Sequence, residues 1–142
     1  MSSIEVRHGY HKLLAAALRA VQFSKPARFV VRDQLRAGFR DPKADFDADR
    51  VRRTVWFLNA AAQERGLEHK IVKNLIHTQW KRAKAGGKPR TYGEVLTATS
   101  KSLHKRAKEE VVAEMAYTQY DQMVAMLNET MGLCLRGGGN GL

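Results

Sequence analysis

Hydrophobic residues near the start of the chain recur with the period of an α-helix. They follow the spacing i, i+3, i+4, i+7, i+8, i+11, which places them on one side of a helix: Tyr10, Leu13, Leu14, Ala17, Leu18 and Val21. The pattern predicts a helix over about 4–23. Ser24-Lys25-Pro26 interrupts it, and a second helix is expected over about 26–40. Pro42 ends that helix, because the residue before a proline is disfavoured in the helical region.

Three more helices are expected farther along the chain. Asp47 is a good N-cap for a helix over about 47–65, and a fourth helix of about 67–83 carries an apolar face beside a basic one. Thr91 and Glu94 have the spacing of a capping box, which begins a long helix over about 91–135. No strand alternation or internal repeat is visible, so the sequence predicts an all-α fold.

The length of 142 residues suits one domain with a packed core. We expect a helical core over 1–83, a basic linker over 84–90, a C-terminal helical extension over 91–135 and a disordered tail over 136–142. Basic residues outnumber acidic ones, giving a net charge of +11. The excess lies before residue 109, since residues 109–142 carry 1 basic and 5 acidic side chains. This imbalance favours an acidic partner over simply solvated helix faces.

Residues typical of enzymes and metal sites are sparse. The single cysteine, Cys134, cannot form an internal disulfide, and it indicates a reducing compartment. His8 and His11 share a helix face, but no carboxylate or cysteine nearby completes a metal site. We therefore expect no enzyme activity and no metal. The sequence has no apolar run of about 18 residues and no secretory signal at its start, so we expect an intracellular protein without a membrane span.

The spacing of Tyr10, Leu13 and Leu14 in the first helix, followed by Arg36, Phe39 and Arg40 in the second, resembles the LYR-motif family of mitochondrial adaptors. The resemblance covers about residues 8–82. Gly9 stands where the family has leucine and His11 where it has arginine, so the match depends on the combined spacing over two helices.

The resemblance implies an antiparallel three-helix core that binds the mitochondrial acyl carrier protein. The partner's 4′-phosphopantetheine arm and its acyl chain would enter a tunnel between the helices, and the chain would need no cofactor of its own. Expected carrier-protein contacts are Tyr10, His11, Lys12, Arg36 and Arg40. Expected tunnel residues are Leu13, Leu14, Leu18, Phe39 and Val55. The alternative for the leucines and Val55 is an ordinary helix-bundle core.

A cluster of basic residues begins at the end of the part of the chain that resembles the family. It is expected to dock on a large assembly or on RNA phosphates, and it comprises Lys81, Arg82, Lys84, Lys88 and Arg90. The favoured assembly is the mitochondrial large ribosomal subunit in the matrix, together with a ribosome-silencing-factor-like protein. Three alternatives remain: an accessory subunit or assembly factor of a respiratory complex, a structural RNA-binding mitoribosomal protein without a carrier partner, and a solvated basic loop.

Overall fold

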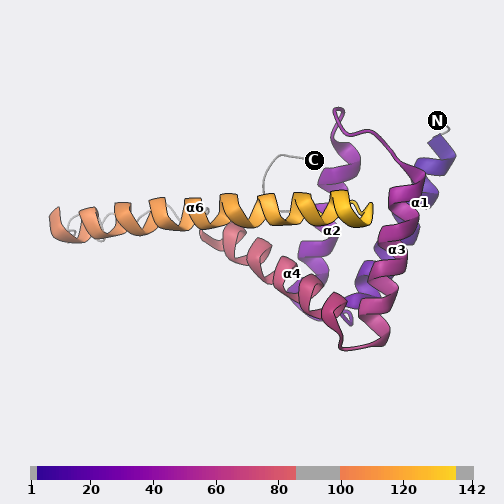
Figure 1. Ribbon diagram of the computed structural model, residues 1–142, viewed down its shortest axis with the longest axis horizontal. Helices are drawn as coiled ribbons and strands as arrows, with labels where there is room; N and C mark the ends of the chain where they lie inside the picture. The colour runs from indigo at the N-terminus through magenta and orange to yellow at the C-terminus, as the bar shows by residue number, and fades with distance from the viewer. Residues whose placement is uncertain (1–2, 86–99, 137–142) are drawn as a thin grey trace.

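The computed structural model describes residues 3–85 and 100–136. Within these ranges every regular element is a helix, which confirms the all-α prediction (Figure 1). The helices are α1 (Ser3–Ala20), α2 (Ala27–Arg40), α3 (Ala48–Gln63), α4 (Leu67–Ala85) and α6 (Ser100–Met131). The expected start of the last helix at residue 91 lies outside the described residues. None of the described helices has the length and apolar character that crossing a membrane requires.

Helices α1 to α4 form a bundle in which α1 packs along α3 and also contacts α2, while α4 contacts both α2 and α3. The buried face of α1 differs from the expected stripe, because it consists mainly of small residues: Gly9, Leu13, Ala16, Ala17 and Ala20. Side chains this small let helix backbones approach closely, whereas Tyr10, Leu14 and Leu18 are only partly buried at its margin.

The start of α3 and the end of α1 are determined by different local features. The Asp47 carboxylate accepts hydrogen bonds from the backbone N–H groups of Asp49 and Arg50 at 2.9 and 3.2 Å, as expected of an N-cap. Helix α1 ends at Ala20, three residues before the predicted end. There the backbone turns through positive φ angles of 53° and 55° at Gln22 and Phe23. The apolar pattern continues through Val21 because that side chain still packs against the core.

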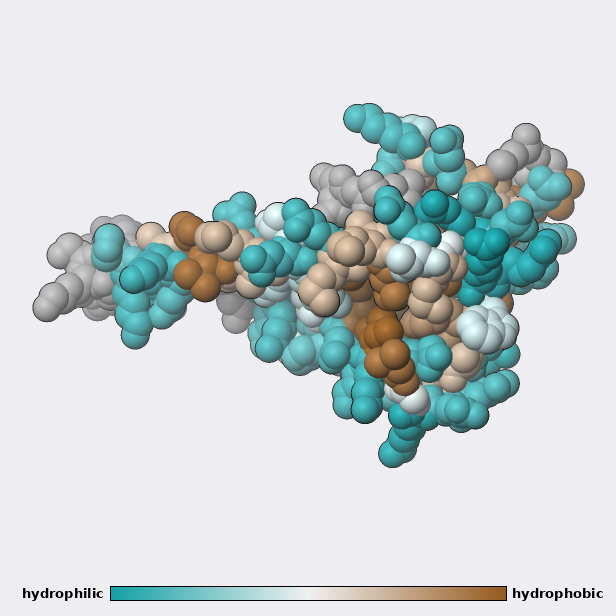
Figure 2. All heavy atoms as spheres, in the orientation of Figure 1, coloured by the Kyte–Doolittle hydropathy of each residue, from teal (hydrophilic) through white to brown (hydrophobic). Residues whose placement is uncertain are grey.

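Near its middle, α6 meets the C-terminal end of α4, and its N-terminal half projects from the bundle (Figure 1). Arg82 of α4 makes the main polar link: it donates to both carboxylate oxygens of Asp121 at 2.9 and 3.1 Å and to the Tyr117 carbonyl at 2.9 Å. Its guanidinium also lies 4.3 Å from the centre of the Tyr117 ring. Figure 2 shows hydrophobic side chains on the projecting part of α6, where Val111 and Met115 are exposed.

The last helix ends at Met131, so the prediction that it continues to residue 135 is wrong. Gly132 has a positive φ of 65°, and the Leu133 N–H donates to the Asn128 carbonyl at 2.9 Å. This is a Schellman ending, and glycine is the residue that adopts it most readily. Residues 133–136, called here the strap, then fold back onto the bundle with Leu133 and Leu135 buried. Arg136, expected in the disordered tail, is part of this strap, and residues 137–142 lie outside the described range.

Candidate functional site

A cavity of about 350 Å³ lies between α1, α2, α3, α4 and the strap. Its wall is mostly apolar and includes Leu13, Val31, Phe39, Leu58, Leu75 and Leu135. A buried cavity of about 150 Å³ lined by such residues can hold benzene. The space here is more than twice as large, so by that comparison it has room for an aliphatic chain of roughly a dozen carbons.

An aromatic cluster joins α1, α2 and the loop that follows α2. The ring of Tyr10 meets that of Phe39 edge to face, with centroids 5.3 Å apart, and Phe39 lies 6.2 Å from Phe46. Phe39 and Phe46 both line the cavity. The two aromatic residues singled out in the sequence, Tyr10 and Phe39, are therefore in ring contact, and Phe39 connects the pair to the cavity wall.

Gly9 lies against this aromatic cluster. A Cβ atom at Gly9 would lie 2.9 Å from two carbons of the Phe46 ring, closer than real Cβ contacts. Glycine at this position, where the resembled family has leucine, therefore leaves space for Phe46 beside α1. The glycine that departs from the family pattern is thus the residue that makes room for the Phe46 ring.

The charged residues of α1, α2 and the loop that follows α2 carry both signs. Among the expected contact residues, His11, Lys12, Arg36 and Arg40 are exposed, with Arg36 and Arg40 one turn apart on α2. The cavity wall nearby also contains carboxylates, two of which have basic neighbours. Arg50 lies 3.6 Å from Asp47, and Arg136 lies 3.9 Å from Asp41. Arg36 and Arg40 do not line the cavity, and their exposure on α2, a helix that does line it, leaves them available to an acidic partner.

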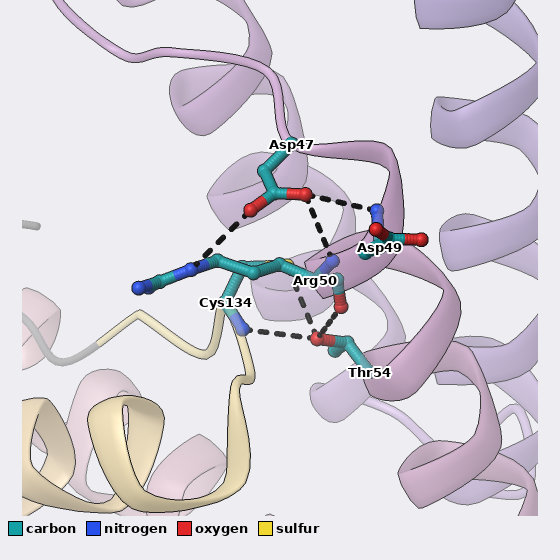
Figure 3. Close-up of polar contacts among 5 residues, drawn as sticks. All are labelled: Asp47, Asp49, Arg50, Thr54 and Cys134. Carbon is teal, nitrogen blue, oxygen red and sulfur yellow. Dashed lines mark hydrogen bonds and ion pairs between the residues drawn. The ribbon is translucent and has the colours of Figure 1, made fainter.

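The strap is held to α3 through Thr54 and Cys134 (Figure 3). The Thr54 hydroxyl donates to the Arg50 carbonyl at 2.8 Å and accepts the Cys134 N–H at 2.9 Å. The Cys134 sulfur lies 3.1 Å from the same oxygen. Because the single hydroxyl proton is used on Arg50, the thiol is the donor in that contact. Burial raises the pKa of the Cys134 thiol above its ordinary value, which keeps it protonated.

Two residues of the cavity wall, Gln79 and Arg136, each have one buried polar atom that lacks a partner among the described residues. Gln79 of α4 is only 5% exposed; its side-chain nitrogen donates to the Arg136 carbonyl, while its oxygen Oε1 is unpaired. The second atom is Nη1 of Arg136, which lies beside Gly38 of α2. Both residues line the cavity, but these two atoms themselves have almost no solvent-accessible surface.

The structure separates the residues expected to line an acyl tunnel into two groups. Leu13 and Phe39 line the cavity. Leu14, Leu18 and Val55 are partly buried but are not part of its wall, and Val55 packs against the core. The spacing of apolar residues could not separate these groups, because cavity walls and solid cores have the same periodicity.

The expected docking residues also differ from one another. Lys81 and Lys84 are exposed on α4, and Lys84 lies 4.9 Å from the centre of the Trp80 ring. Arg82 is instead paired with Asp121 inside the chain and is not free for an external partner. Lys88 and Arg90 lie outside the described residues. In the described ranges, no group of three or more histidine, cysteine, aspartate or glutamate residues is arranged to hold a metal ion.

Sequence reasoning missed the strap residues and Gln79 as parts of the cavity. Gly132 was a usable signal, since glycine commonly follows the last residue of a helix. Gln79 gave no comparable signal, because a glutamine beside an apolar helix face usually lies at a solvated boundary.

No protein family model matches this chain, and no solved structure matches it. The chain is similar to UPF0593 mitochondrial protein C806.05 of Schizosaccharomyces pombe. The two are 48% identical over 60 residues, which make up 42% of this chain and 48% of that protein. The matched segment thus spans about half the length of the curated relative.

Proposed function

We propose that this protein is a non-enzymatic mitochondrial adaptor that binds an acylated acyl carrier protein. The observation that carries the proposal is the mostly apolar cavity of about 350 Å³, one wall of which is α2, the helix on which Arg36 and Arg40 are exposed. The similarity to a mitochondrial protein of fission yeast supports the location. The matrix is the proposed compartment.

The chemistry of the partner fits the two parts of this site. Acyl carrier proteins are acidic, so the exposed basic residues of α1 and α2 offer complementary charge and faster encounter. The acyl chain would replace empty space or water in the cavity with methylene groups. Each buried methylene contributes about 0.8 kcal/mol, so a chain that fills the space contributes several kcal/mol after ordering costs.

Native mass spectrometry of the protein purified from cells with active acyl carrier protein tests this proposal. The expected result is an acidic partner that carries the mass of phosphopantetheine plus an acyl chain. Arg36→Glu together with Phe39→Ala should release that partner and leave helix content unchanged.

A matched pair, Arg65→Glu with Phe29→Ala, changes the same residue types at exposed positions outside the cavity wall. It should retain the partner. Purification without any acyl carrier protein, or equal loss of the partner from both pairs, contradicts the proposal.

The proposed docking target is the mitochondrial large ribosomal subunit during its assembly, with a ribosome-silencing-factor-like protein and rRNA nearby. The exposed basic face of α4 supports an anionic target, and it includes Lys70, Lys73, Lys81 and Lys84. Lys81→Glu with Lys84→Glu should weaken co-sedimentation with large ribosomal subunits, and added salt should weaken it in the unchanged protein. Sedimentation with respiratory complexes instead would favour a role as an accessory subunit or assembly factor of such a complex.

A further inference from the structure

We infer that a second cavity, between the α1–α2 turn and α4, binds a small aromatic anion. This cavity has a volume of about 370 Å³ and is lined by residues within 20–27 and 69–80. It shares Val72 and Ile76 with the first cavity, and its other lining residues are different. The site is therefore separate from the one proposed for an acyl chain, and its ligand is a flat ring system that carries a negative charge.

The turn on one side of the second cavity is held by hydrogen bonds within the chain. The Ser24 hydroxyl donates to the Val21 carbonyl at 2.8 Å, and the Ser24 carbonyl accepts the Arg28 N–H at 2.9 Å. Val21 and Ser24 both line the cavity. Because the chain's own contacts hold this wall in place, the cavity does not depend on a ligand to form.

The charged and titratable side chains of the lining are all basic. They are Lys73, His69 and His77 of α4, which follow one another at intervals of four residues and so share one side of the helix. None of the described lining residues is an aspartate or a glutamate. The first cavity differs, because Asp41 and Asp47 are part of its wall. An anion that enters the second cavity therefore meets positive charge and no carboxylate from the lining.

Lys73 is the lining residue whose charge is available to a ligand. Its side chain is exposed, and none of the ion pairs formed within residues 3–85 and 100–136 includes it. A lysine ammonium has three donors and pairs readily with a carboxylate. Lys73 is thus placed to bind the charged group of the ligand.

The remaining lining favours a flat apolar body on that ligand. The rings of His77 and Trp80 lie within 29° of parallel, with centroids 6.2 Å apart. Val21 and Val72 add aliphatic surface. An aromatic ring can lie against these side chains and bury apolar area while its carboxylate reaches Lys73. An inorganic anion would gain only the attraction of the charges.

Cinnamate and cinnamamide test the inference, because they have nearly the same shape and only cinnamate carries a charge. Titration calorimetry measures the affinity of each for the full chain, and cinnamate should bind more tightly. The cinnamate-to-cinnamamide affinity ratio should fall about fivefold in Lys73→Met, as expected for the loss of one ion pair at a partly open site. Lys70→Met is the matched control, since Lys70 is exposed on the same helix and does not line the cavity. It should change the ratio little.

The two tryptophans of the chain provide a second measurement in the unchanged protein. Trp80 lines the second cavity, whereas Trp56 of α3 is 64% exposed and lines neither of the two cavities. In nuclear magnetic resonance spectra, cinnamate should shift the indole N–H signal of Trp80 and leave that of Trp56 in place. Trp80→Phe assigns the two signals.

Three results would overturn the inference. The first is that neither compound binds. The second is an equal fall of the ratio in Lys73→Met and Lys70→Met, or equal shifts of both tryptophan signals, because general attraction to a basic protein would then explain the binding. The third is loss of cinnamate binding in Phe39→Ala, because Phe39 lines the first cavity and not the second. Cinnamate binding that persists in Phe39→Ala supports the separate site.

Discussion

Asn128 binds both backbone polar groups of Leu135. Its side-chain oxygen accepts the Leu135 N–H at 3.0 Å, and its side-chain nitrogen donates to the Leu135 carbonyl at 2.6 Å. Both residues are buried, so this pair of hydrogen bonds gives the backbone of the strap partners where water does not reach it freely. A single side chain of α6 thereby positions one wall of the cavity.

Replacing Asn128 with alanine should destabilise the protein by about 2 kcal/mol, because two buried backbone groups lose their partners. Urea unfolding followed by circular dichroism measures this change. Glu129→Ala, at the exposed neighbouring position, should have little effect. Equal stability of the two variants would show that the strap does not depend on Asn128.

The Cys134 thiol should react slowly with a disulfide reagent at pH 8. Burial raises its pKa, so the reactive thiolate is scarcer than for an exposed cysteine, and the rate should keep rising above the pH at which a free thiol levels off. The reaction is followed by absorbance, with denatured protein as the control. Asn128→Ala should accelerate it by loosening the strap, and a native rate equal to the denatured rate would contradict the buried placement.

Introducing the two residues of the resembled family should change the free energy of unfolding to different extents. Gly9→Leu should lower the free energy of unfolding by about 1–3 kcal/mol, because the new side chain meets the Phe46 ring. His11→Arg should change it by less than about 0.5 kcal/mol, since His11 is exposed. Thermal unfolding of both variants checks the comparison, and a neutral Gly9→Leu would show that Phe46 can move aside freely.

Gly132→Ala should also be destabilising, by about 1–2 kcal/mol. An alanine at a positive φ is strained, and its Cβ would meet the Arg53 guanidinium unless that side chain moved. Arg53→Ala removes the second obstacle and leaves the first. The penalty of Gly132→Ala, measured by urea unfolding, should therefore be smaller in the Arg53→Ala background, and an unchanged penalty would assign all of it to the backbone.

Removing the polar link between α4 and α6 should make the backbone of α6 exchange its hydrogens faster and leave the bundle of α1 to α4 folded. Arg82→Met deletes the hydrogen bonds to Asp121 and to the Tyr117 carbonyl, and hydrogen exchange should become faster along the C-terminal half of α6. Lys81→Met alters an exposed neighbour and should leave exchange unchanged. Faster exchange in α1 and α3 as well would mean that α6 supports the whole fold.

The helices could be predicted because their apolar spacing, the Asp47 cap and the proline after α2 are local features. The buried face of α1 could not, because hydrophobicity favours Leu14 and Leu18 whereas close packing favours Ala16 and Ala20. That choice depends on how near the neighbouring helix lies, which no single segment encodes.

The candidate site was predicted in part for the same reason. Tyr10 and Phe39, chosen from the sequence as a carrier contact and a tunnel residue, are in ring contact, and Leu13 lines the cavity. The strap and Gln79 were missed because their contacts join positions far apart in sequence, such as Thr54 and Cys134 or Gln79 and Arg136. Arg82 looked like its basic neighbours, and only the position of Asp121 shows that its charge is used internally.

The distance of 80 positions between Thr54 and Cys134 has a consequence for biogenesis. During translation, α1 to α4 leave the ribosome well before residues 133–136 are made. Closing so large a loop is slow compared with forming the helices themselves. A newly made chain therefore passes through a stage in which the cavity lacks the wall formed by Leu135, and its apolar lining is then most accessible to molecular chaperones.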